Sequence, residues 1–294
     1  MTSQFKLGLG LALVASFMFS LKPILIKEAY ALGANSEGLM VLRMWFAFPF
    51  YLALLIWQYP QLASKKRYIA SAVATGFLGY FLSSYLDLLA LESISAHAER
   101  IILYAYPSLV VLIKAAWDKK MPSKNVLFAV VIVYAGLIVL LPGEFTLHGS
   151  WLGLMLMLSC AVTFAIYVLL SKPLIEKLGA GLFTSIAMVS SCLFTQVNLL
   201  NTPIQAVLDY SWSIYGYGFA LAFFSTVIPS YAMSAAIARI GSERTAITGT
   251  TGPLFTTLLA VWILGETLTG FHLAGLGLVI LGVFLISKPI SAIK

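Results

Sequence analysis

Charged residues are scarce in this 294-residue chain: Asp, Glu, Lys and Arg make up 10% of it, whereas hydrophobic residues make up 61%. Soluble domains carry roughly 25% charged and about 45–50% apolar residues, so the composition excludes an ordinary water-soluble globule. The mean hydropathy of +0.96 predicts that the natural solvent of the chain is a lipid bilayer. The 11 Pro and 22 Gly are spread along the chain, which excludes a low-complexity protein.

Several chemical motifs are absent from the sequence. The chain has two cysteines, Cys160 and Cys192, and both lie inside apolar runs, which excludes a disulfide framework and a cysteine metal site. No Gly-rich loop ends in Gly-Lys-Ser or Gly-Lys-Thr, so an ATP-driven pump is not expected. The three histidines lack zinc spacing, and no Gly-x-Ser-x-Gly elbow occurs. We therefore expect no metal, no cofactor and no enzymatic activity.

Long apolar runs dominate the chain instead. A transmembrane helix needs roughly 20 apolar residues to cross the hydrocarbon core, and ten such runs are present. They cover about 7–30, 37–57, 68–91, 93–117, 124–142, 149–172, 181–200, 212–238, 243–265 and 269–288. The runs are too long for strands and lack period-two alternation. The sequence thus predicts an all-α integral membrane protein with ten transmembrane helices joined by short loops.

The basic residues predict the orientation of these helices. If the N-terminus is cytoplasmic, 14 of the 18 Lys and Arg lie on the inner side, and the outer loops hold acids instead. Positive residues on the inner side are typical of membrane proteins, so both termini are expected in the cytoplasm of a bacterial cell, with an uncleaved first helix in the inner membrane. The net charge of +7 therefore reflects topology rather than binding of nucleic acid.

The chain aligns with itself at a shift of 146 residues. This shift pairs Pro107 with Pro253, Tyr85 with Tyr231, and Gly136 with Gly282. Chance similarity between apolar helices is the alternative explanation. We expect two repeats, 1–146 and 147–294, and five helices in each would insert the second repeat in the opposite orientation. Inverted repeats recur in secondary transporters, which bind substrate between the halves.

The segment 262–266, Trp-Ile-Leu-Gly-Glu, followed by Gly275 and Gly282, resembles the end of the EamA-like repeat of the drug/metabolite transporter superfamily. The spacing of Lys27 and Arg43 resembles the start of that repeat, and Pro107 and Pro253 match its fourth-helix proline. The resemblance covers the whole chain. It implies ten helices around a central cavity and transport of small metabolites, often outward. The first copy departs from the pattern at 117–120, Trp-Asp-Lys-Lys, so its turn between helices 4 and 5 is expected to differ.

Four basic residues are left inside the predicted helices, all in the outer half of the first repeat: Lys22, Lys27, Arg43 and Arg100. The acids Glu28, Asp87 and Glu99 share this region. A charge inside the membrane costs on the order of 2.5–3.5 kcal/mol by insertion scales, so each should face a partner or a wet cavity. We expect Asp87 to pair with Arg100, and Glu99 to pair with Lys22, Lys27 or Arg43. The cluster either holds helices 1–4 together or binds a substrate or a coupling proton.

Helical spacing adds polar residues to the expected cavity. They are Tyr80, Ser84, Tyr104 and Thr248, together with the repeat-related Tyr85 and Tyr231. Core tyrosines and close packing through small residues are the structural alternatives. Pro107 and Pro253 are candidate hinges, because a proline inside a helix frees the carbonyl four residues earlier, here those of Leu103 and Gly249. A proline can also be merely tolerated in a membrane helix.

The leading hypothesis is a secondary transporter that exports a small metabolite, such as an amino acid or a derivative, by alternating access. Its coupling is either absent or a proton exchange. Its partners would be a small-molecule substrate, the lipid bilayer and, in the coupled case, protons. An importer with the same fold is the second hypothesis. A receptor or scaffold that does not transport is the third.

Overall fold

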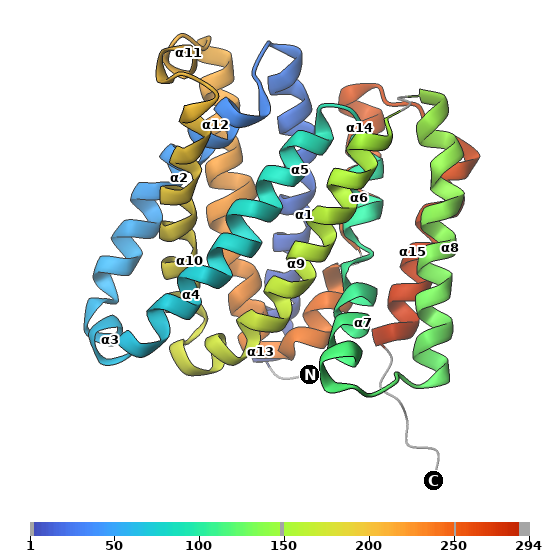
Figure 1. The fold of residues 1–294 in the computed structure, drawn as a ribbon, viewed down its shortest axis with the longest axis horizontal. Coiled ribbons are helices and arrows are strands. Elements are labelled where there is room, and N and C mark those ends of the chain that lie inside the picture. The colour runs from blue at the N-terminus through green and yellow to red at the C-terminus, as the bar shows by residue number, and fades with distance from the viewer. Residues whose placement is uncertain (1–2, 148–149, 250, 288–294) are drawn as a thin grey trace.

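The computed structural model describes residues 3–147, 150–249 and 251–287, and within these ranges the chain forms helices and turns, with no strand. The α-helices are Ser3–Ala31 (α1), Ser36–Trp57 (α2), Tyr59–Ser64 (α3), Ile69–Gly76 (α4), Ser83–Leu91 (α5), Ala96–Leu103 (α6), Tyr106–Asp118 (α7), Lys124–Leu147 (α8), Trp151–Leu178 (α9), Ala180–Phe194 (α10), Ile204–Leu208 (α11), Trp212–Ala222 (α12), Ile228–Gly249 (α13), Thr251–Leu264 (α14) and Gly270–Ser287 (α15). Two 3-10 helices, Lys66–Tyr68 (η1) and Thr195–Leu200 (η3), and two π-helices, Phe77–Leu82 (η2) and Phe223–Val227 (η4), adjoin them. Figure 1 shows one bundle of long helices.

Within the described residues, eight helical segments are long and apolar enough to cross a membrane. They are Gln4–Ala31, Ser36–Trp57, Lys66–Leu91, Ala96–Asp118, Lys124–Gly143, Trp151–Leu178, Ala180–Leu200 and Trp212–Ile240. Each overlaps one of the first eight predicted runs, so the all-helical membrane fold is confirmed. Two shorter apolar helices follow, Thr251–Leu264 and Gly270–Leu285. The count of ten spans therefore stays a prediction.

The predicted boundary between the eighth and ninth runs is wrong. α13 continues through 239–242 to Gly249, and α14 begins at Thr251, so 243–249 belong to the helix before this boundary. The segment 239–242 contains Gly241, but one glycine inside a helix costs only ~1 kcal/mol relative to Ala. Arg239 and Arg244 are good helix formers, and they allow α13 to continue.

The backbone follows the same shift of 146 residues as the sequence. Four described residues have a positive φ: Gly33 and Gly179 follow α1 and α9, and Lys119 and Gly265 follow α7 and α14. The shift of 146 residues carries Gly33 to Gly179 and Lys119 to Gly265. The π-helices η2 and η4 also begin 146 residues apart. The turn after α7, expected to differ from its counterpart, has the same left-handed backbone, with Lys119 at φ 50° and Gly265 at φ 65°.

The helices α8 and α15 lie side by side (Figure 1) and approach each other through glycines. A Cβ atom on Gly136 would lie 2.9 Å from the carbonyl oxygen of Gly275, and one on Gly282 would lie 2.9 Å from that of Ala129. The shift of 146 carries Gly136 to Gly282 and Ala129 to Gly275, so it exchanges the two contacts. The α8–α15 interface therefore has approximate two-fold symmetry, as expected when two copies of one repeat face each other.

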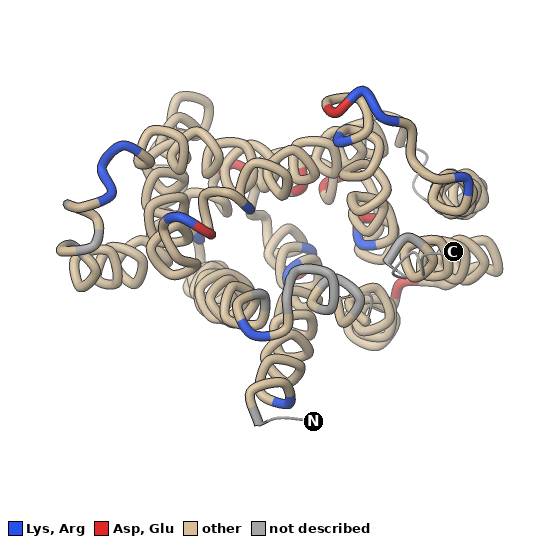
Figure 2. The backbone as a smooth tube through the Cα atoms, turned by 90° about the horizontal axis from the view of Figure 1, so that it is seen from below, with Lys and Arg blue, Asp and Glu red and all other residues tan. Residues whose placement is uncertain are grey.

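The first helix of each half packs into the other half. α1 lies against α13 and α14, and α9 lies against α5 and α7. α1 also contacts α5 and α6, which carry the predicted intramembrane charges. The described ends of the chain, the start of α1 and the end of α15, lie at the same end of the bundle (Figure 1). Seen from that end, Lys and Arg segments border several of its turns (Figure 2).

Candidate functional site

An ion pair joins α1 to α5 inside the membrane-spanning part of the bundle. Lys22 Nζ contacts Asp87 Oδ2, and the two side chains are only 15% and 2% exposed. The predicted pairing of Asp87 with Arg100 is therefore wrong. The apolar character all round α1 leaves its rotation undetermined from the sequence, and packing against α5 turns Lys22 towards Asp87.

Arg100 lies beside Glu99, its neighbour in α6. Arg100 Nη2 donates a hydrogen bond of 2.7 Å to the carbonyl oxygen of Phe19 in α1, and its Nε lies 3.4 Å from Glu99 Oε2. The predicted pairing of Glu99 with another cation is thus wrong as well. Glu99 and Asp87 are both fully enclosed and interact with each other.

Three hydroxyl groups connect this region to α13 and α14. Ser16 and Tyr104 both donate to the carbonyl oxygen of Gly249, and Ser20 donates to that of Gly252 at 3.0 Å. The carbonyl that Pro253 was predicted to free is therefore bound by protein hydroxyls. Thr248, half-buried in the preceding turn, accepts a hydrogen bond of 2.9 Å at its carbonyl from Thr251.

Both candidate hinge prolines lie at the start of a helix rather than inside one. Pro107 is the second residue of α7, which follows α6 after a turn at 104–105, and Pro253 is the third residue of α14. A proline in the first helical turn removes no backbone hydrogen bond. Their role as hinges stays a prediction.

The π-helix η2 changes which residues of the third predicted span face inward. Its wider turn carries Tyr80, which accepts a hydrogen bond of 2.9 Å from Tyr167. In the following α5, Ser83 is buried and lies 3.2 Å from the thiol of Cys160, whereas the predicted Ser84 is half-buried. A π-turn shifts the helical phase, and the i, i+4, i+7 spacing of a regular α-helix cannot anticipate that shift.

The repeat-related tyrosines bind different partners. The Tyr85 hydroxyl donates to Glu37 Oε1 at 3.0 Å, near the end of the bundle that holds the α1–α2 turn. The Tyr231 hydroxyl lies 2.7 Å from Ser185 Oγ, and its ring is 5.6 Å from that of Tyr51. The sequence did not single out Tyr51 or Tyr167. Tyr167 could have been found from the repeat. In the first helix the two copies align at a shift of 145, which pairs Lys27 with Lys172 and Lys22 with Tyr167.

Neither Arg43 nor Lys27 is part of the Lys22–Asp87 ion pair. Arg43 is 2% exposed on α2. Lys27 is half-buried, and its charge acts on Glu266 in the turn between α14 and α15. Burial alone would raise the pKa of Glu266. Hydrogen bonds from His97 and the Ala96 amide, together with the charges of His97 and Lys27, outweigh that effect and lower it.

The contact of His97 with Glu266 was missed by the sequence analysis. His97 Nδ1 lies 2.6 Å from Glu266 Oε2, and Ala96 N–H donates to Glu266 Oε1 at 2.9 Å. The His97 and His272 rings are 4.3 Å apart. The contact joins the first half of the chain to the second. Three histidines scattered along the sequence gave no signal for it.

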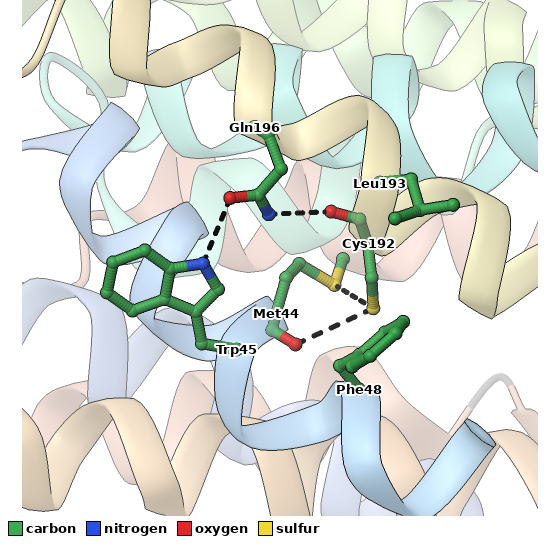
Figure 3. Close-up of a pocket in the computed structure, with 6 residues that line it drawn as sticks. All are labelled: Met44, Trp45, Phe48, Cys192, Leu193 and Gln196. Atoms are coloured by element: carbon green, nitrogen blue, oxygen red, sulfur yellow. Dashed lines mark hydrogen bonds between the residues drawn. The ribbon is translucent and has the colours of Figure 1, made fainter. Parts of the chain in front are cut away.

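A pocket of about 270 Å³ lies between α2 and the α10–η3 segment (Figure 3). Its lining residues are Met44, Trp45, Phe48, Cys192, Leu193 and Gln196. Trp45 Nε1 donates to Gln196 Oε1 at 3.0 Å, and the rest of the lining is largely apolar. None of the charged candidates lines this pocket, so the predicted central cavity stays a prediction.

Comparison with known proteins gives three likenesses. The EamA-like transporter family matches residues 6–141 and again residues 151–288. The chain is 33% identical over 285 residues to the uncharacterized transporter YcbK of Bacillus subtilis (strain 168), which covers 93% of this chain and 89% of that protein. A solved structure, described only as a crystal structure of a protein, shares the fold with a TM-score of 0.62 and 17% identity over 95% of both chains.

Proposed function

Since this chain belongs to the EamA-like transporter family, and so to the drug/metabolite transporter superfamily of membrane transporters, we propose that it is a secondary transporter that exports a small polar or amphipathic metabolite. An amino acid or a derivative is the class we propose. Alternating access would proceed through a cavity between two inverted repeats, 1–146 and 147–294. Both termini would lie in the cytoplasm, with α14 and α15 as the ninth and tenth spans.

The Lys22–Asp87 ion pair is the observation that carries this proposal. It lies inside two membrane-spanning segments, where charges are costly and are commonly kept for substrate or ion pathways. Glu99 and Arg100 extend the cluster on α6, and α1 also contacts α13 and α14 of the other repeat. A substrate held here would touch elements of both repeats, which is what alternating access requires.

The glycine contacts between α8 and α15 support the inverted arrangement, because one shift exchanges them. Accessibility of single introduced cysteines would test the topology. Substitution of Ser64 and of Glu92, at opposite ends of the third span, should give labelling from opposite sides of the membrane. Labelling of both from the same side would contradict the proposed topology.

A thermal-shift panel of amino acids, amines, sugars and nucleotides on purified protein would identify the substrate, because a compound that binds the native state raises its stability. Flux of the binding compound in liposomes then tests transport and its direction. Growth of cells that produce the protein separates the two directions. Improved growth on an externally supplied nutrient would favour import, whereas resistance to a compound made inside the cell would favour export.

Proton coupling is tested separately. Asp87→Asn and Glu99→Gln each remove one carboxyl group that could carry the coupling proton. If flux is coupled, at least one variant should lose its dependence on a pH gradient. Unchanged gradient dependence in both variants would contradict coupling through this cluster.

A further inference from the structure

Arg43 is a buried cation with no bonded partner among the described residues. It is 2% exposed, its Nε has no hydrogen-bond partner, and no carboxylate oxygen of the described residues lies within 4 Å of its guanidinium. It lies in the third turn of α2, about 10 Å from the start of that helix. An unpaired charge at this depth is costly.

The neighbours of Arg43 do not neutralise it. Its electrostatic neighbours are Asp87 of α5, Tyr51 of its own helix, Cys192 of α10 and Tyr30 of α1. Three of these four are hydroxyl or thiol groups, which are neutral as a rule near pH 7. The fourth, Asp87, already contacts Lys22. None of these four groups supplies a bonded anion to the guanidinium.

The buried carboxyl groups of this region are already engaged by other cations. Asp87 contacts Lys22, and Glu99 lies beside Arg100, so neither of them forms an ion pair with Arg43. A guanidinium presents a planar fork of N–H donors that matches a carboxylate.

We propose that Arg43 is the anion-binding subsite of this protein and takes a small monoanion, the carboxylate of a bound substrate or a free chloride ion. The proposal rests on the proposed function only for the substrate as a source of the anion. Lys22 and Asp87 would then neutralise each other, while the bound anion supplies the negative counter-charge for Arg43.

Thermal unfolding of the purified protein in detergent tests the subsite. Sodium acetate and sodium chloride are titrated at constant ionic strength, with sodium methanesulfonate as the balancing salt. At least one of the two anions should raise the Tm of the wild-type protein with a saturable dependence. A response to acetate alone assigns the site to a carboxylate, and an equal response to chloride assigns it to a small monoanion in general.

Arg43→Met removes the charge and keeps the length of the side chain. Its Tm in methanesulfonate should equal or exceed that of the wild-type protein, and its apparent anion affinity should fall by at least about 10-fold. Arg100→Met is the matched control: it leaves the Phe19 carbonyl without its donor and Glu99 without its neighbouring cation, so it should lower the Tm. Arg43→Lys keeps the charge but loses the planar fork, so it should bind the anion more weakly and still fold.

The proposal is overturned if neither anion shifts the wild-type Tm. It is also overturned if Arg43→Met and Arg43→Lys respond to the anions as the wild-type protein does, or if Arg43→Met lowers the Tm in methanesulfonate as much as Arg100→Met. Because the measurement needs no transport, its outcome is separate from that of the liposome flux experiment.

Discussion

The two repeats share their backbone turns but bury different chemistry. In the first repeat, α1 and α5 are joined by the Lys22–Asp87 ion pair. The shifts of 145 at the first helix and 146 elsewhere carry these residues to Tyr167 and Met233 in the second repeat. Tyr167 donates a neutral hydrogen bond to Tyr80 of the first repeat. A common fold thus holds an ionic cluster at one position and an aromatic contact at its counterpart.

This difference shows which features the fold requires and which serve a particular task. Gly33 and Gly179 at helix ends, and Gly136 and Gly282 between α8 and α15, occupy related positions in both repeats, because backbone geometry demands them. By contrast, Lys22, Asp87, Glu99 and Arg100 have uncharged residues at the related positions of the second repeat. A feature needed only for folding would be expected in both copies, so the asymmetry favours a role of the charges in binding.

The largest difference between the repeats should appear when one partner of each contact is removed. Lys22→Ala leaves Asp87 buried without its cation and should lower the free energy of unfolding by about 3–5 kcal/mol. Tyr167→Phe breaks one neutral hydrogen bond and should cost about 1 kcal/mol. Thermal unfolding of both variants in the same detergent measures the two losses. Equal losses would mean that the two contacts are energetically equivalent.

The glycine contacts should respond alike in the two repeats. Gly136→Leu and Gly282→Leu each place a side chain against the facing backbone and should destabilise the protein by about 1–3 kcal/mol. Gly277→Leu, on the same helix as Gly282 but with open space around it, is the control and should have little effect. A large loss for one glycine and none for the other would argue against the two-fold relation.

The turns after α7 and α14 offer a smaller and opposite pair of effects. Lys119 occupies the left-handed backbone region that its counterpart Gly265 adopts without a Cβ atom. Lys119→Gly should stabilise the protein by about 1 kcal/mol, and Gly265→Ala should destabilise it by a similar amount. Denaturation midpoints of the two variants give the signs, and a shift in the same direction for both would contradict the shared geometry.

The smallest expected effect concerns Glu266, which the shift relates to Lys120, a residue of opposite charge. Its pKa is lowered from the ordinary 4.5, so the ionised form contributes stability above that pH. This contribution is lost as the pH falls through the lowered folded-state pKa. The stability difference between the wild-type protein and Glu266→Gln should shrink as the pH falls below 4.5. A difference that grows on acidification would refute the lowered pKa.

Long apolar runs were sufficient to predict eight helices, because a membrane span needs a fixed length of apolar sequence. The buried charges could also be recognised, since few charged residues occur inside those runs. Their partners could not. Lys22 binds Asp87 rather than Glu99 because of the rotation of α1, and the phase change at η2 buries Ser83 rather than Ser84. Rotation and phase depend on packing across the repeats.

The central claim is that the Lys22–Asp87 pair serves transport rather than folding alone. The most direct test is the double variant Lys22→Met with Asp87→Leu, which replaces both charges by apolar side chains and leaves neither unpaired. Flux of the compound identified by the thermal-shift panel is measured in liposomes beside the Tm of the same preparation. We predict a Tm close to that of the wild-type protein and a flux reduced to the level of empty liposomes. Wild-type flux at an unchanged Tm would contradict the account.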